Sequence, residues 1–218
     1  MTLSAVEASI SEITRHLDQI TARRERLIKE SRDVIALSAK SIVDVHTSDS
    51  RAAKVERRKA RDKLDALRKV AGSDLNRYLL VPEQEYVECS VILSVSGDSD
   101  IPTQKQLGVS QPSYILGLLD SIGELKRSVF DCVRKGDFKS AEKMFSVMEA
   151  LYTILSPLAV YDNVVQGIRR KLDVARILVD DTRAAITEES RRREFISSVN
   201  RLSTLLSSTP KDTSLLQK

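Results

Sequence analysis

Two short acidic pairs are the residues in this sequence with the clearest capacity for chemistry. Glu85 and Glu88 lie in PEQEYVECSVI, and Asp120 and Glu124 lie in SYILGLLDSIGELKR. Residues three or four apart share one face of a helix, with Cβ atoms roughly 5–6 Å apart. Each pair can therefore present two carboxylates side by side, and we hypothesise that all four meet around a divalent cation.

The first acidic pair lies among apolar neighbours, where charge is costly. A helical segment that is apolar on nearly all sides is a buried one, so Glu85 and Glu88 are expected to enter the core. Two carboxylates about 6 Å apart repel by roughly 3 kcal/mol at an effective dielectric of ~20. A cation, an arginine partner or a raised pKa has to relieve that repulsion. On the residues alone, Asp120 and Glu124 also fit an ordinary polar helix face.

The other residue types argue against several kinds of site. His16 and His46 lie in or beside the N-terminal helix, away from the acidic pairs in the sequence, so an imidazole general base is not expected. Cys89 and Cys132 fall within apolar helical patterns, which indicates reduced core residues and no zinc site. The sequence contains no glycine-rich phosphate loop. The remaining hard oxygen ligands suit Mg²⁺ or Mn²⁺ and favour metal-assisted phosphodiester hydrolysis.

The elements that must position these residues are expected to be helices throughout. The 218 residues include 30% charged, 41% hydrophobic and 4% aromatic residues, with only seven glycines and five prolines. This composition predicts an all-α protein, a bundle of about seven long antiparallel helices. No apolar run approaches the ~20 residues of a membrane span, and MTLSAVEASISEITRHL is too charged for a signal peptide. We therefore expect a cytoplasmic protein with no membrane partner.

Apolar spacing and capping residues place the helices along the chain. The expected helices are 3–45, 51–71, 72–95 with Pro82 as a kink or restart, one beginning at Pro112, 138–155, 159–187, and a last one after Thr187 to about Leu206. Residues 1–206 form one domain in this interpretation, and 207–218 form a loose tail. The apolar seams are longer than a small bundle needs, which predicts a homo-oligomer.

Basic residues flank the acidic middle of the chain. Residues 1–80 carry 17 Lys/Arg against 12 Asp/Glu, residues 81–135 carry 5 against 8, and residues 136–218 carry 13 against 11. Helix 51–71 is strongly basic and has only a thin apolar stripe, so it favours contact with a nucleic-acid backbone. A solvated face with local ion pairs is the alternative. The predicted nucleic-acid-binding residues are Arg51, Lys54, Arg57, Arg58, Arg61 and, on the acidic helix, Arg127.

Two motifs resemble the translin superfamily, in particular its translin-associated factor X branch and archaeal or prokaryotic members. Residues 113–138, SYILGLLDSIGELKRSVFDCVRKGDF, are similar to a family helix of the form (D)YLxGVxDxxGELxRxxxNxVxxGD. QEYVE at 84–88 resembles the acidic helix of the factor X branch, and 159–187 resembles the family's long late helix. The resemblance extends over residues 75 to 190, and the loop at 96–112 is compressed relative to the family.

The resemblance implies a translin-like bundle that assembles into a hollow shell, which in this family is often an octamer. It also implies an Mg²⁺- or Mn²⁺-dependent endoribonuclease acting on single-stranded or unwound RNA, with Glu85, Glu88 and Asp120 catalytic and metal-binding and Glu124 a further metal ligand. Two alternatives stay open. One is a non-catalytic shell that binds single-stranded RNA or DNA, and the other is a purely structural coiled-coil assembly protein.

Overall fold

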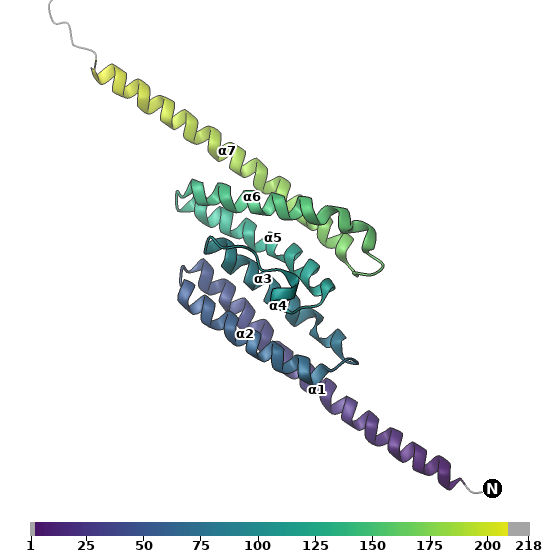
Figure 1. Cartoon of the computed structure of the whole chain (residues 1–218). Helices are drawn as coiled ribbons and strands as arrows, with labels where there is room; N and C mark the ends of the chain where they lie inside the picture. The colour runs from purple at the N-terminus through teal and green to yellow at the C-terminus, as the bar shows by residue number, and fades with distance from the viewer. Residues whose placement is uncertain (1–2, 209–218) are drawn as a thin grey trace, which may run out of the picture.

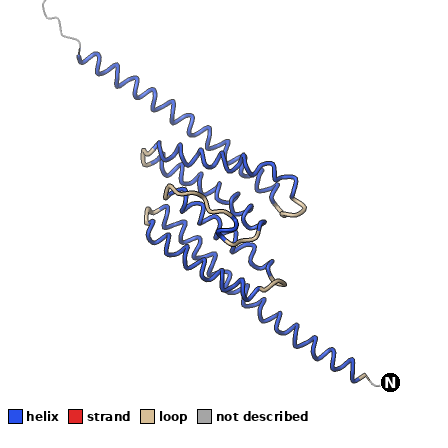
Figure 2. The backbone as a smooth tube through the Cα atoms, in the orientation of Figure 1, coloured by secondary structure: helices blue, strands red, loops and turns tan. Residues whose placement is uncertain are grey.

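The described part of the chain, residues 3–208, folds into α-helices and two short 3₁₀ helices without a strand, as a computed structural model shows (Figures 1 and 2). The prediction of an all-α fold with about seven helices is confirmed. The elements are α1 (Ser4–His46), α2 (Ser50–Ala71), η1 (Asn76–Leu79), α3 (Leu80–Ser96), α4 (Gln104–Leu107), α5 (Gln111–Arg134), α6 (Phe138–Leu155), η2 (Ser156–Tyr161) and α7 (Ile168–Ser208).

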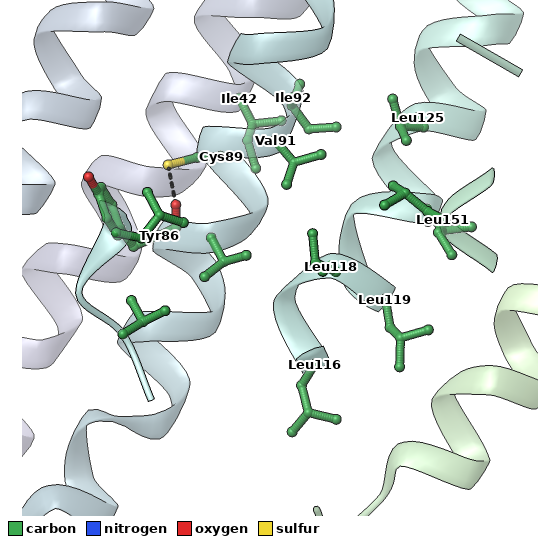
Figure 3. Packing of buried hydrophobic residues seen from close by; sticks show 14 of the residues in the cluster. Ile42, Tyr86, Cys89, Val91, Ile92, Leu116, Leu118, Leu119, Leu125 and Leu151 are labelled. Atoms are coloured by element: carbon green, nitrogen blue, oxygen red, sulfur yellow. Dashed lines mark hydrogen bonds between the residues drawn. The ribbon is translucent and has the colours of Figure 1, made fainter. Parts of the chain in front are cut away.

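The helices stack in layers with α3 and α5 in the middle (Figure 1). The hairpin of α1 and α2 packs on one side of α3, and α6 and α7 pack on the far side of α5. Figure 3 shows the apolar side chains that fill the space between α3 and α5 and their neighbours, among them Tyr86, Ile92, Leu118 and Leu125. Because α3 has neighbours on both sides, its polar residues must find partners within the protein.

Gly117 sets the separation of the two central helices. A Cβ atom at this position would lie 2.7 Å from the carbonyl oxygen of Gln84 and 2.7 Å from Cβ of Val87. Only a glycine therefore allows the backbones of α3 and α5 to approach this closely. The contact lies one residue before Glu85 on α3 and three residues before Asp120 on α5, so it brings the two acidic segments together.

Side-chain caps mark the starts of α2, α4 and α6. Asp49 accepts a hydrogen bond from the amide of Ala52 at the start of α2, and Thr103 forms a capping box with Gln106 around α4. Asp137 caps α6 through the amide of Ser140. These caps satisfy amide groups that the first turn of a helix leaves without partners, which is why the sequence signal for them is strong.

The prediction of two helices after Pro157 is wrong. The chain continues from α6 into η2, turns at Gly167, where φ is +85°, and then forms a single helix through Thr187. The Asp162 carboxylate accepts a hydrogen bond from the amide of Arg169 and so marks the start of α7. The Thr187 hydroxyl donates to the carbonyl of Arg183 one turn earlier, which lets this residue stay inside the helix.

The segment Phe138–Tyr161 differs from the expectation that no part of the chain is apolar enough to span a membrane. It is a continuous helical stretch of 24 residues with a mean hydropathy of 1.4, so by length and composition alone it is long and apolar enough to cross a membrane. Core helices of water-soluble proteins meet the same criterion, and here α6 packs against α5 and α7. The predicted tail at 207–218 lies almost wholly outside the described residues.

Candidate acidic centre and basic groove

Glu85 and Glu88 on α3 and Asp120 on α5 lie close enough for their charges to interact. Burial raises the pKa of Glu85, and the negative charges of Asp120 and Glu124 raise it further against the opposing effect of Lys171. Burial also raises the pKa of Glu88 to about 8, with added repulsion from Glu85, Asp120 and Glu124. In both cases burial is the main cause, and the neighbouring carboxylates add to it more than Lys171 offsets.

Glu124 makes a contact that the sequence analysis did not anticipate. Nε2 of His46, at the end of α1, lies 2.8 Å from a carboxylate oxygen of Glu124, and Nδ1 lies 3.5 Å from Asp131. The His46 side chain is buried, with 7% of its surface exposed. The expectation that both histidines lie away from the acidic residues is therefore wrong for His46, because the packing of α1 on the bundle brings its last turn to α5. The hydrogen bond to His46 lowers the pKa of Glu124.

Asp120 also has a basic partner. The ammonium group of Lys171, on α7, forms an ion pair and hydrogen bond with the Asp120 carboxylate. Both side chains line a cavity of about 500 Å³ between α5 and α7, together with Arg170 and Gly123. Lys171 is thus the cation that the protein itself supplies next to the acidic pairs, and its charge acts on Glu85 and Glu88 as well.

The donor set suits a hard divalent cation by its chemistry. Four carboxylates supply oxygen ligands, and the raised pKa values of two of them indicate that added positive charge would be favourable. Within residues 3–208, however, no three Asp, Glu, His or Cys side chains already stand close enough together to hold an ion. Asp120 and Glu124 are held by Lys171 and His46, so these two carboxylates would have to change partners to bind one.

The predicted basic residues of α2 gather in one groove. Their side chains line a cavity of about 1040 Å³ between α2, α3 and the segment 97–102; the residues are Arg51, Lys54, Arg57, Arg58 and Arg61. In the part of the chain that the structure describes, only Arg61 of these five is in an ion pair, at 3.8 Å from Asp65. Nε of Arg57 is buried there without a hydrogen-bond partner in the same described part. Asp100 also lines the groove, so five positive side chains against one carboxylate leave it with an excess of positive charge for an anionic ligand.

Arg127 does not belong to this groove. Its side chain lies on α5, 57% exposed, with Nη1 3.7 Å from the Glu124 carboxylate. The structure thus separates the six predicted nucleic-acid-binding residues into five in the groove and one beside the acidic centre.

Glu83 is a buried carboxylate that the sequence analysis passed over. Arg68 lies 3.3 Å from one of its oxygens, and the amide of Ser110 donates to the other at 2.9 Å. These contacts tie α2 to α3 and to the start of α5, so this carboxylate is already satisfied and is not a candidate ligand. Its spacing from Arg68 in the sequence gives no signal of the pairing.

Comparison with known proteins places the chain in a family. The family model described as "Translin family" matches residues 80–181. The uncharacterised protein MJ0175 of Methanocaldococcus jannaschii is 33% identical over 166 residues, which are 75% of this chain and 74% of that protein. The chain belongs to the translin family. The matched segment contains all four carboxylates and Lys171, whereas the basic helix α2 and His46 precede it.

Three solved C3PO structures share the fold of this translin-family chain. AfC3PO, in its crystal structure, shares 31% sequence identity with this chain and superposes with a TM-score of 0.75. The match covers 85% of this chain and 98% of AfC3PO. A structure described as an AfC3PO–duplex RNA complex is 29% identical with a TM-score of 0.76 and the same coverage. Apo-NeC3PO, at 20% identity and a TM-score of 0.73, covering 83% of this chain and 96% of that one, shows the same fold.

Proposed function

We propose that this translin-family protein binds RNA and cleaves it as an Mg²⁺- or Mn²⁺-dependent endoribonuclease. The observation that supports the proposal is that Glu85 and Glu88 on α3 and Asp120 on α5 influence one another electrostatically, with the pKa of both glutamates raised. Half-buried carboxylates with raised pKa values are costly to keep ionised, so their presence favours a role in binding a cation. The similarity to a protein solved with duplex RNA supports RNA as the ligand.

RNA binding is assigned to the basic groove. Its five Lys/Arg side chains line a cavity of about 1040 Å³, and four of them have no ion-pair partner in the described structure. Unpaired Lys/Arg side chains contribute most to nucleic-acid affinity, because neutralising phosphate groups releases the counterions bound to them. The groove is lined by Tyr86 and Leu93 of α3, the helix that also carries the acidic centre.

Cleavage would depend on residues of both central helices. Glu85, Glu88 and Asp120 would hold the cation. Glu124, which contacts His46, would be a fourth oxygen ligand or would orient another ligand. When bound, a divalent cation polarises the phosphate and lowers the pKa of an attacking water. Partial burial of the two glutamates limits the access of bulk water to the carboxylates, and Gly117 fixes the distance between the helices that supply them.

A cleavage assay tests this proposal. Labelled single-stranded RNA, duplex RNA and single-stranded DNA are incubated with protein and Mn²⁺, and separately with a chelator. We expect metal-dependent cleavage of RNA that is lost in Glu85→Gln combined with Asp120→Asn, whereas Glu83→Gln serves as a control for removal of a nearby structural carboxylate. RNA cleavage that persists in the double variant would refute the catalytic role.

A non-catalytic RNA-binding protein is the second candidate. It is favoured by the ion pairs that Lys171 and His46 already make with Asp120 and Glu124, because these supply the positive charge that a cation would bring. In that case RNA binding would be unaffected by the acidic substitutions and no cleavage would occur. Loss of binding on combining Arg57→Ala with Arg58→Ala is expected for both candidates.

The proposal includes a homo-oligomer, in keeping with the expected hollow shell. The family to which the chain belongs and the long apolar seams of α1 and α7 support assembly. Native mass spectrometry of the protein gives the number of subunits directly.

A further inference from the structure

The first and last α-helices extend beyond the layered body as two arms. The α1 arm is residues 3–19, before Ile20 packs against the core, and the α7 arm is residues 190–208. At 1.5 Å per residue these arms are about 25 Å and about 28 Å long. Figure 1 shows them leaving the body at opposite corners. The guanidinium of Arg193 lies 5.0 Å from the ring of Phe138 and marks the base of the α7 arm.

Each arm carries an apolar stripe that is exposed in the single chain. Five side chains of the α1 stripe are 49–66% exposed: Leu3, Val6, Ile10, Ile13 and Leu17. Four side chains of the α7 stripe are 45–78% exposed: Phe195, Val199, Leu202 and Leu206. In both stripes the spacing alternates between three and four residues, which is the pattern of a helix that packs lengthwise against one other helix.

The charges of the two arms are opposite. The α1 arm has three carboxylates against one arginine, a net charge of −2. The α7 arm has four arginines against one glutamate, a net charge of +3. Pairing two α1 arms or two α7 arms would bring like charges together, whereas pairing one of each brings opposite charges together along a shared apolar seam.

Resting on the homo-oligomer proposed above, we propose that the α1 arm of one copy packs against the α7 arm of a second copy of this chain. The two arms of a single chain cannot meet because they leave the body at opposite corners (Figure 1). Every copy therefore offers both halves of the contact, and each junction between copies uses one α1 arm and one α7 arm. Such a junction between different surfaces produces a closed pair or ring if the rotation between copies closes, and an open chain of copies if it does not.

Two double variants of the full chain test the pairing. Ile10→Asp with Ile13→Asp disables the α1 stripe, and Val199→Asp with Leu202→Asp disables the α7 stripe. Native mass spectrometry is expected to show loss of the higher-mass species for each variant alone. When the two variants are mixed, the intact α7 arm of the first and the intact α1 arm of the second should form a mixed species.

Matched controls place the same charges away from the apolar stripes of the arms. Ala8→Asp with Ser11→Asp, and Ser197→Asp with Asn200→Asp, should keep the mass of the unmodified assembly. The far-UV circular dichroism of all four variants should be unchanged, since none of the replaced side chains is buried. Unchanged mass in both stripe variants would overturn the proposal. So would variants that keep assemblies of their own and form no mixed species, because that result indicates pairing between identical arms.

Discussion

Glu88 is the residue whose environment departs most from its ordinary chemistry. A carboxyl group with a folded pKa of about 8 holds its proton through most of the neutral range when no cation is present. The protonated form stabilises the fold fully below the unfolded pKa of 4.5, and this contribution is lost as pH rises through about 8. Metal-free protein should therefore lose stability progressively as the pH rises from about 4.5 to about 8. A protein whose carboxylates are paired instead loses stability as the pH falls.

The first prediction concerns this pH dependence. In the presence of a chelator, we expect the unfolding free energy of the protein to fall by roughly 2–4 kcal/mol between pH 5 and pH 9. Glu88→Gln should remove most of that fall, because the amide does not ionise. Chemical denaturation at several pH values measures the effect. An equally steep fall in the Gln variant would show that Glu88 is not the titrating group.

The second prediction concerns Lys171, whose ammonium occupies the Asp120 carboxylate that a cation would need. The Lys171→Met variant should bind Mn²⁺ more tightly, because it frees the Asp120 carboxylate from its ion pair. A partly exposed ion pair contributes about 1 kcal/mol, so the affinity for Mn²⁺ should rise roughly fivefold. Isothermal titration calorimetry measures the change.

Lys126→Met is a matched control for this substitution. Lys126 joins α5 to α7 through Asp181 at 3.1 Å, which is the same pair of helices at a different point. Its substitution should leave Mn²⁺ affinity unchanged. Weaker binding in Lys171→Met would instead indicate that the lysine supports the site.

At the scale of elements, the contact of α3 with α5 determines whether the carboxylates can meet. The third prediction is that Gly117→Ala destabilises the protein by about 1–3 kcal/mol, because the added methyl group would lie 2.7 Å from backbone and side-chain atoms of α3. Gly123→Ala in the same helix is the control, since its nearest neighbour is a flexible Leu178 methyl at 3.9 Å. The control should be neutral or slightly stabilising because alanine favours helix. Thermal unfolding compares the two, and equal stability would contradict the role of Gly117.

The helices themselves could largely be predicted from the sequence, because apolar spacing and caps are local. Asp49, Thr103 and Asp137 each signal a helix start within three residues of the amide that they bind. The length of α7 could not be predicted, since Thr187 is compatible with a break or with a hydrogen bond back into the helix. The contact of His46 with Glu124 joins residues 78 positions apart. Only the packing of α1 against α2 and α3 brings the last turn of α1 to α5.

At the scale of the whole molecule, α3 separates positive from negative charge. The basic groove lies between α3 and α2, and the acidic centre lies between α3 and α5.

The fourth prediction is that RNA affinity falls steeply with salt, and that Arg57→Ala with Arg58→Ala lowers the slope of log affinity against log salt by about 1–2. Fluorescence anisotropy at several salt concentrations measures this slope, and Lys139→Ala with Lys143→Ala on α6 is the control for removal of two positive charges elsewhere. An unchanged slope in the arginine variant would place RNA outside the groove.

The central claim is that the carboxylates of α3 and α5 form one divalent-cation site. Anomalous diffraction from crystals soaked in Mn²⁺ tests it most directly, because the ion is located independently of any activity. The account predicts an anomalous peak between residues 85–88 and 120–124, with Lys171 moved away from Asp120. Crystals that show no peak there, with the ion pair of Lys171 and Asp120 intact at saturating Mn²⁺, would contradict it.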